Sequence, residues 1–264
     1  MRPPLASRFL STLQMPSRTI KSHSCLTFDC YGTLVDWEGG IYKGLAPLTR
    51  KLPPSHQLYN DRLGTLRSFI KHESRVQSLN PTAIYSTVLG SAYGDFSVKL
   101  GLGEPTAEEK ARFGVSVGEW PVFPDTVEAL RRLQKHFKLV ILSNVDWDSF
   151  RKTLAGPLAG VDFDAVYVAE DIGSYKPDLR NFRYLVDRCR QDLGVEQDGI
   201  IHTAQSLFHD LAPAKEIGLA GAWIERGEEV DSVMGGDLRD FEGKVDISWR
   251  FRNMREMADF VDSS

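Results

Sequence analysis

The sequence predicts an α/β protein, a Rossmann-like doubly wound parallel sheet with an inserted helical cap. Three observations lead to this fold class. Short apolar runs recur along the chain, helix-like segments lie between them, and one long stretch after the first run shows helical periodicity alone. Alternation of strands and helices is typical of parallel sheets with helices on both faces.

The apolar runs are read as buried parallel strands because each is short, nearly continuous and rich in β-branched or aromatic residues. There are five such runs, CLTFD (25–29), KLVILSN (138–144), DAVYVAE (164–170), GIIHTA (199–204) and AGAWIE (220–225). Helices are expected between them over DSFRKTLAGPLAG (148–160) and DLRNFRYLVDRCRQDLG (178–194), each ending at glycine. The C-terminal segment 247–264 predicts an edge strand or loop and a closing helix.

The stretch from Trp37 to about residue 118 contains no convincing buried strand. Helical periodicity is present over residues 59–77, 81–101 and 105–120. We therefore expect a helical cap over 37–118, inserted in a core domain made of 23–36 and 119–264. A cap above the carboxyl ends of the strands would restrict what enters a site there.

The N-terminal residues 1–22 differ in composition from the rest. Arg2, Arg8, Arg18 and Lys21 occur among several serines, with no acid before Asp29. This composition is typical of an organellar targeting peptide, and the alternative is a disordered start. A cytoplasmic location is expected, with mitochondrial targeting as the alternative.

Overall composition narrows the classes of partner. The 264 residues carry a formal net charge of -4 and three scattered cysteines. This argues against nucleic acid or a membrane surface as the main partner, and against a disulfide framework or a zinc site. No apolar run approaches the ~20 residues of a membrane-spanning helix. We expect a small-molecule substrate as the partner. The sequence is compatible with a homodimer as well as with a monomer.

Polar side chains stand at the expected carboxyl ends of the strands, where chemistry is found in such sheets. Asp29, Ser143 and Thr203 all fall there. A carboxylate at this edge can attack carbon or phosphorus and form an ester that water later opens. Lys176 of SYKPD would keep Asp29 ionised.

Four motifs in order resemble those of the haloacid dehalogenase superfamily: FDCYGTL (28–34), LSN (142–144), YKPDLRNF (175–182) and AQSLFHDLAPAKEIGL (204–219). The resemblance implies a hydrolase whose cap is inserted between the first two motifs. It places the nucleophile on Asp29 and the supporting catalytic groups on Thr33, Ser143, Lys176 and Asp210. Tyr31, Asn144 and Ser174 are expected to contact the substrate. Arg62 is a candidate for the arginine that dehalogenases of this superfamily carry about thirty residues after the nucleophile, and the alternative is a surface arginine.

Two departures from the phosphatases of this superfamily concern the reaction. Most carry a second aspartate two residues after the nucleophile, where this chain has Tyr31, and an acid that binds magnesium where it has Gln205. A tyrosine of ordinary pKa about 10 cannot shuttle a proton near neutral pH, and an amide is a poorer ligand for a hard cation.

Tyrosine at this position resembles the type II (S)-2-haloacid dehalogenases, which need no metal. There the aspartate displaces halide from carbon, and a halide leaves without a proton. We therefore expect metal-free, cofactor-free hydrolysis of a small carboxylic acid. The first alternative is a phosphatase with Mg²⁺ held by Asp29, Tyr31 and Asp210. The second is a binding protein without turnover, since Tyr31, Gln205 and Phe182 all depart from a pattern of the superfamily.

Overall fold

A single parallel sheet forms the centre of the computed structural model, which describes residues 19–227 and 232–264. Its strands follow the order β3-β2-β1-β4-β5-β6, and every neighbouring pair is parallel. The strands are β1 (Cys25–Phe28), β2 (Lys138–Ser143), β3 (Ala165–Val168), β4 (Ile200–Ala204), β5 (Ala220–Ile224) and β6 (Trp249–Phe251). The five strands predicted from apolar runs are confirmed, and β6 is the predicted edge strand.

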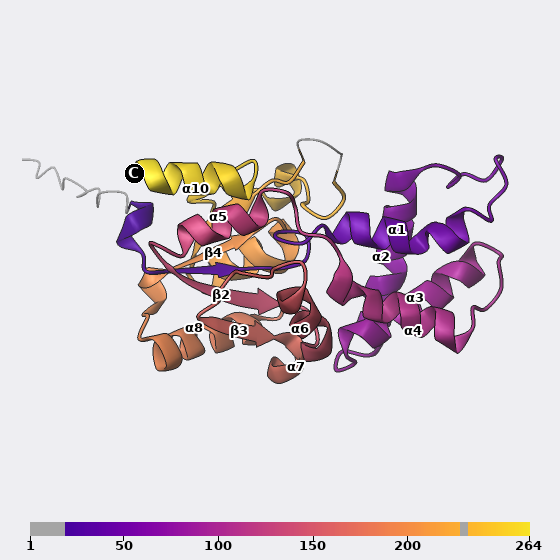
Figure 1. Cartoon of the computed structure of the whole chain (residues 1–264), viewed down its shortest axis with the longest axis horizontal. Helices are drawn as coiled ribbons and strands as arrows, with labels where there is room; N and C mark the ends of the chain where they lie inside the picture. Colours follow the sequence, from indigo (N-terminus) through magenta and orange to yellow (C-terminus); the bar gives the residue numbers. More distant parts are fainter. Residues whose placement is uncertain (1–18, 228–231) are drawn as a thin grey trace, which may run out of the picture.

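Strand side chains alternate between two apolar layers, as the period of a strand requires. In β2, Leu139 and Ile141 join the larger core cluster, whereas Val140 and Leu142 join a second cluster on the opposite face. Helices α5 (Thr126–Leu133) and α10 (Met254–Ser263) cover the first face, and α8 (Leu179–Leu193) covers the other (Figure 1). The doubly wound sheet predicted from the sequence is therefore confirmed.

The remaining core helices connect the strands. They are α6 (Trp147–Ala155), α7 (Ala169–Ile172) and α9 (Ala212–Glu216), with the short turns η1 (Ile20–Ser22), η3 (Gln197–Gly199), η4 (Leu207–Leu211) and η5 (Leu238–Phe241). Asp178 caps the start of α8, and Gly194 ends it in the left-handed conformation, as the predicted C-terminal glycine requires.

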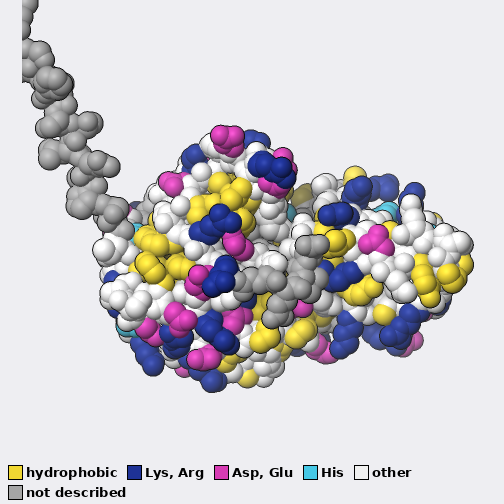
Figure 2. Space-filling model, turned by 90° about the horizontal axis from the view of Figure 1, so that it is seen from above, with side chains coloured by type: hydrophobic (Ala, Val, Ile, Leu, Met, Phe, Trp, Pro, Cys, Tyr) yellow, Lys and Arg dark blue, Asp and Glu magenta, His cyan; other side chains and the backbone are white. Residues whose placement is uncertain are grey.

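The chain between β1 and α5 is helical, with α1 (Trp37–Thr49), α2 (Arg62–Leu79), α3 (Tyr85–Lys99), α4 (Ala107–Val115) and η2 (Ser116–Glu119). These helices form a lobe beside the sheet (Figure 1). Two chain segments connect this lobe to the core, one at Val35 and Asp36 and the other at Pro121 and Val122. They lie side by side, because Val35 forms a β-bridge with Val122 and the amide of Asp36 donates to the carbonyl of Pro121. In space-filling view, acidic and basic side chains are interspersed over the core lobe (Figure 2).

The start of the fold lies earlier than the sequence suggested. Ile20 is buried in the larger core cluster, and Lys21 Nζ donates to the carbonyl of Ser264 at 2.8 Å. The ordered core thus includes residues 19–22, which were assigned to the N-terminal segment. Residues 1–18, which carry most of the targeting-like composition, lie outside the described residues. No helix of the described chain is long and apolar enough to cross a membrane.

Candidate active site

Asp29 stands immediately after β1, at the carboxyl edge of the sheet. Its amide donates to the carbonyl of Thr203 on the neighbouring strand at 3.1 Å, so its backbone is fixed by the sheet itself. The carboxylate receives one donor on each oxygen. Thr33 Oγ1 donates to Oδ2 at 2.7 Å, and Lys176 Nζ donates to Oδ1 at 2.8 Å. The side chain is held in one orientation and is almost fully buried.

The ammonium of Lys176 joins the two acids of the site. Its three protons are matched by Asp29 Oδ1, by Asp210 Oδ1 at 2.7 Å and by the Leu142 carbonyl at 2.9 Å. Burial alone would lower the pKa of Lys176, but the carboxylates of Asp210 and Asp29 outweigh it and raise that pKa above its usual value. The lysine is therefore a fixed cation between two carboxylates.

The two carboxylates differ in electrostatic environment. Burial raises the pKa of Asp29 above its ordinary value, and the attraction of Lys176 only partly opposes it. Burial also acts on Asp210, yet Lys176 and the hydrogen bond from His202 lower the pKa of Asp210 to about 2. Carboxylates whose pKa values are pushed apart by their surroundings are suited to different roles in one reaction.

The turn after Asp29 is tied to the fourth motif. Gly32 has φ +103°, a conformation that side chains rarely adopt, and a Cβ there would lie 3.1 Å from Gln205 Oε1. The Gln205 amide donates to Thr33 Oγ1 at 2.9 Å, and its side chain Nε2 donates to Ser232 Oγ at 3.0 Å. Gln205 thus supports the turn that orients Thr33 toward Asp29.

The second motif presents two polar side chains at the end of β2. Ser143 Oγ is buried and has no hydrogen-bond partner within the described chain, although the residue lines the pocket of Asp29. A buried hydroxyl without a partner costs about 1–3 kcal/mol, which a ligand oxygen would relieve.

Asn144, the next residue, positions the backbone of Lys176. Its side chain accepts from the Lys176 amide at 2.7 Å and donates to the Lys176 carbonyl at 3.1 Å, which fixes the lysine backbone.

These residues open onto a cavity of about 150 Å³ between the core and the cap. This is well below the ~300–1,000 Å³ of drug-sized ligand sites, so only a small molecule fits. Core residues on its wall include Asp29, Tyr31, Ser143, Asn144, Lys176, Ser206, Phe208, His209, Asp210, Val233 and Met234. Cap residues include Trp37, Ile70, Glu73, Ser74, Gln77 and Tyr85.

Tyr31 lines this cavity but its hydroxyl is engaged elsewhere. Its OH lies 2.7 Å from Thr153 Oγ1, and its ring packs edge-on against Trp120. Burial raises the pKa of Tyr31 well above its ordinary value, so the phenol stays neutral. Tyr31 forms a wall of the pocket and is poorly suited to exchange protons.

The sequence analysis did not identify the part played by His202. His202 Nε2 lies 3.0 Å from Asp210 Oδ1, and Nδ1 lies 2.8 Å from Thr27 Oγ1. A histidine inside an apolar strand needs polar partners on both nitrogens, and that is the signal that could have indicated this pairing. Glu73 was missed as well. It lies on the same helical face as buried Phe69 and Val76, where an acid is unexpected.

Two predicted substrate contacts do not line the cavity of Asp29. Ser174 Oγ accepts from Asn181 Nδ2 at 3.0 Å inside the core. Arg62 donates to Glu38 at 3.2 Å and lines a second cavity of about 430 Å³. The spacing of Arg62 from the nucleophile suggested proximity, but the start of α2 directs it to the other side of Glu38.

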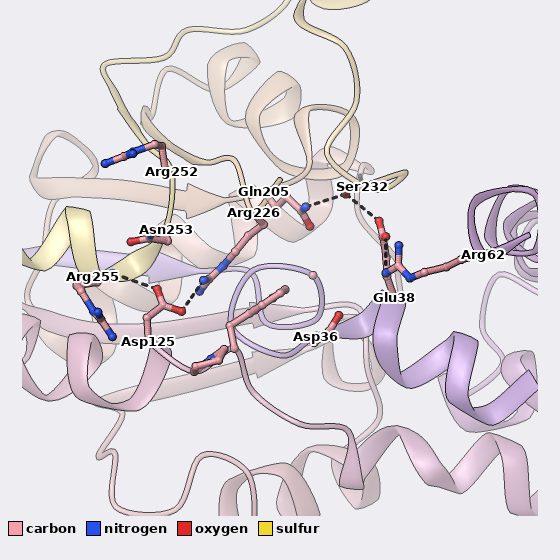
Figure 3. A pocket seen from close by; sticks show the side chains of 13 residues that line it. Asp36, Glu38, Arg62, Asp125, Gln205, Arg226, Ser232, Arg252, Asn253 and Arg255 are labelled. Carbon is pink, nitrogen blue, oxygen red and sulfur yellow. Dashed lines mark hydrogen bonds and ion pairs between the residues drawn. The ribbon is translucent and has the colours of Figure 1, made fainter. Parts of the chain in front are cut away.

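The second cavity contains the buried pair of Arg226 and Asp125, 2.6 Å apart (Figure 3). The guanidinium of Arg226 also lies 4.1 Å from the ring centre of Phe123 and donates to the Thr33 carbonyl at 2.8 Å. Glu38 accepts from Ser232 Oγ and from the amides of Val233 and Met234, as well as from Arg62. Through its bond to Thr33, Arg226 supports the turn that follows Asp29 on the side away from the active-site cavity.

Residues 19–227 and 232–264 contain no group of three or more His, Cys, Asp or Glu side chains arranged to hold a metal ion. The donor set suggested for magnesium is Asp29, Tyr31 and Asp210. Lys176 lies between the two carboxylates of this set. The side-chain amide of Gln205 donates to Ser232. These residues fit a divalent cation poorly, because Gln205 supplies a neutral amide where a carboxylate would be the better ligand and Tyr31 can supply only its backbone carbonyl.

Comparison with known structures shows the same architecture. The L-2-haloacid dehalogenase PA0810 aligns with 92% of this chain and 100% of its own, with a TM-score of 0.69 and 21% identity. L-2-haloacid dehalogenase from Xanthobacter autotrophicus covers 91% of this chain and 98% of its own, at TM-score 0.68 and 20% identity. The putative HAD-hydrolase YfnB from Bacillus subtilis, bound to magnesium, covers 91% and 99%, at TM-score 0.67 and 17% identity.

A comparison with curated proteins gives no match. A family model described as haloacid dehalogenase-like hydrolase matches residues 23–197, more than half of the 264-residue chain. The match includes Asp29, Ser143 and Lys176, and the fold and site geometry agree with it. The protein is a hydrolase of the haloacid dehalogenase-like family.

Proposed function

We propose that this protein hydrolyses a small carboxylic acid through a covalent ester on Asp29, without a metal ion. The observation that carries the proposal is the position of Lys176, whose ammonium bonds both Asp29 and Asp210. The cation there favours the ionised form of the nucleophile and so opposes the effect of burial. Gln205, a neutral amide bonded to Ser232, stands where a magnesium site would need an acid. The small, partly apolar cavity suits a compact substrate.

In the first step a carboxylate oxygen of Asp29 attacks the substrate carbon. The new C–O bond forms as the bond to the leaving group breaks, and the leaving atom takes the electron pair. The unpartnered hydroxyl of Ser143, on the wall of the same cavity, is a suitable donor for the substrate carboxylate. The substrate would then be held with its reactive carbon toward Asp29.

In the second step water attacks the carbonyl carbon of the new ester. Asp210, ionised because of its low pKa, accepts the water proton directly or through a bridging water. Thr33 and Lys176 each donate to an oxygen of Asp29 and can stabilise the tetrahedral oxyanion. Collapse breaks the bond to the alkoxide, which takes the proton from Asp210, so Asp29 is restored as a carboxylate once its acid proton goes to solvent, and the hydroxy acid is released. A structure of the Xanthobacter autotrophicus enzyme has chloropropionic acid covalently bound, which supports this kind of intermediate.

A single-turnover reaction in ¹⁸O water tests the route. With 2-chloropropionate as probe, label should enter Asp29, because water attacks the ester carbonyl and one oxygen stays with the enzyme. In a phosphatase, water attacks phosphorus, and label would appear in phosphate released from an aryl phosphate. Running both probes with EDTA and with Mg²⁺ separates the two reactions.

Asp29→Asn should abolish turnover, and Asp148→Asn is its matched control because Asp148 is an exposed aspartate on α6. Phosphate release that needs Mg²⁺ and stops in EDTA would replace the proposal with the phosphatase alternative. Near-normal activity of Asp29→Asn would exclude a covalent ester altogether.

A further inference from the structure

Glu73 is an acidic side chain on the cap side of the active site. It lies on α2, is half-buried, and lines the cavity that also contains Asp29. No arginine or lysine from the described cap residues lines this cavity, and the only lysine on its wall is Lys176. The cap therefore presents a carboxyl group to the substrate.

A chain of hydrogen bonds fixes one oxygen of Glu73. Trp37 Nε1 donates to the hydroxyl of Tyr85 at 2.9 Å, and that hydroxyl donates to Glu73 Oε1 at 3.0 Å. The indole N–H can only donate, so it occupies an acceptor position of Tyr85 and leaves the phenol proton for Glu73. Within the described chain, Oε2 of Glu73 has no hydrogen bond and the residue has no ion pair. That oxygen can carry a proton and donate to a ligand.

The surroundings favour the protonated form near neutral pH. Burial raises the pKa of Glu73 to about 7, although the hydrogen bond from Tyr85 acts in the opposite direction. Tyr85 on α3 and Tyr175 beyond α7 are the titratable groups on its cap and core sides. Across the cavity are Asp29, Lys176, His209 and Asp210. Because Lys176 bonds only Asp29, Asp210 and the Leu142 carbonyl, it does not neutralise Glu73.

We propose that Glu73 is the general acid that protonates the leaving atom, so the natural leaving group is a basic oxygen or nitrogen and not a halide. The inference rests on the proposed attack of Asp29 on carbon. A departing halide would be an anion beside a carboxyl group, with no cation on the cap to receive it. A departing alkoxide or amine needs a proton, which neither Tyr31 nor Lys176 can readily supply.

The atoms balance in this scheme. The Asp29 oxygen forms a bond to carbon while the carbon–oxygen or carbon–nitrogen bond breaks, and its electron pair goes to the leaving atom. The proton of Glu73 goes to that atom, and Glu73 becomes a carboxylate. Water then hydrolyses the ester: one of its protons passes through Asp210 to the departing alkoxide, and the other is released to solvent as Asp29 returns to a carboxylate. Glu73 regains a proton from solvent. The sum is hydrolysis of one bond by one water.

Two probes that differ in the leaving atom test this assignment. Glycidate, a three-carbon epoxy acid, opens with an alkoxide that needs a proton, whereas 2-chloropropionate releases chloride. Formation of the Asp29 ester is followed in single turnovers by quenched flow and mass spectrometry, with wild type, Glu73→Gln and the control Glu108→Gln. Glu108 is an exposed acid on α4.

Glu73→Gln should slow ester formation from glycidate by about 10²-fold or more at pH 7 and change the chloropropionate rate by less than about threefold. In wild type the glycidate rate should fall as pH rises through about 7, because Glu73 then loses its proton. The variant should lack this limb of the pH profile.

Equal losses on both probes would make Glu73 a structural residue and overturn the inference, as would an unchanged glycidate rate. Ester formation from chloropropionate but not from glycidate in wild type would also overturn it. If neither probe forms an ester on Asp29, the proposed function itself fails and the inference falls with it. The two failures are thus distinguished by the chloropropionate reaction of wild type.

Discussion

His202 Nε2 lies 3.0 Å from Oδ1 of Asp210, and both side chains are buried. The carboxylate can only accept, so Nε2 carries the proton. On the other side of the ring, Thr27 Oγ1 lies 2.8 Å from Nδ1 and 3.4 Å from the carbonyl of Ile201. Lys176 and His202 bond the same oxygen of Asp210. These two contacts on Oδ1 fix the orientation of the Asp210 carboxylate and therefore the direction of its other oxygen, Oδ2.

Replacing His202 with Gln should slow hydrolysis of the ester more than its formation. Asp210 would keep its charge but lose one of two contacts that set its orientation, so part of the 10²–10⁴-fold contribution of a general base would be lost. We expect a tenfold to hundredfold slower second step, seen as accumulation of the Asp29 ester by mass spectrometry. His136→Gln is the control, since His136 is exposed and pairs with Asp262. Equal slowing of both steps would contradict a role through Asp210.

Replacing Tyr31 with Phe should leave turnover within about threefold of wild type. The hydroxyl bonds Thr153 and its pKa is raised well above the ordinary value, so its proton takes no part in the reaction. Loss of this buried hydrogen bond should cost about 1 kcal/mol in the free energy of unfolding, measured by urea titration. A hundredfold loss of turnover would show that the phenol proton is used.

The sequence predicted the sheet and its order of motifs because apolar runs and strand ends are local signals. Asp29, Lys176 and Asp210 could be expected near one another, since parallel strands bring their carboxyl ends to one edge. Their bonding partners were harder to predict. A strand pattern shows which residues are buried, but it does not show which buried side chain His202 meets. The contact between His202 and Asp210 depends on how the segment after the strand folds back over it.

The cap was predicted as helical but not in its orientation. Which face of α2 meets the core depends on packing among four helices, and a small rotation separates Glu73 in the active-site cavity from Arg62 in the neighbouring one. Sequence distance from the nucleophile cannot resolve that rotation. The local signal for the buried face of α2 is Glu73 itself, an acid on the same face as the buried Phe69 and Val76.

Replacing Glu73 with Gln should stabilise the protein at high pH but not at low pH. The pKa of Glu73 is about 7 in the folded state, against about 4.3 for an unfolded glutamate. An acid whose folded pKa is raised destabilises the fold as pH rises above the unfolded value, and the penalty is complete above the folded value. The gain should be absent near pH 4 and reach up to about 4 kcal/mol at pH 8.

Urea unfolding at both pH values measures this difference, with Glu108→Gln as the control. The amide oxygen of Gln can still accept the hydrogen bond of Tyr85, so the comparison isolates the charge. A stability difference that does not change with pH would mean that Glu73 is not a perturbed acid.

Replacing Lys176 with Met should destabilise the fold as well as remove activity, and the loss should depend on pH. The variant leaves two buried acids without their shared cation, and breaking a buried pair costs about 3–5 kcal/mol. In wild type the pKa of Asp210 is lowered to about 2, so its contribution is complete above the unfolded value of about 3.9 and is lost as pH falls through 2. Without the ammonium, burial raises the pKa of both acids, and the pH dependence of stability reverses: the free energy of unfolding falls as pH rises.

Urea unfolding should therefore show a larger loss of stability at pH 7 than at pH 4. Lys135→Met, on the surface after α5, should show none. Adding Asp210→Asn to Lys176→Met should recover part of the deficit at pH 7, because one buried charge is removed. An equal deficit at both pH values would mean that lost packing, and not uncompensated charge, is the cause.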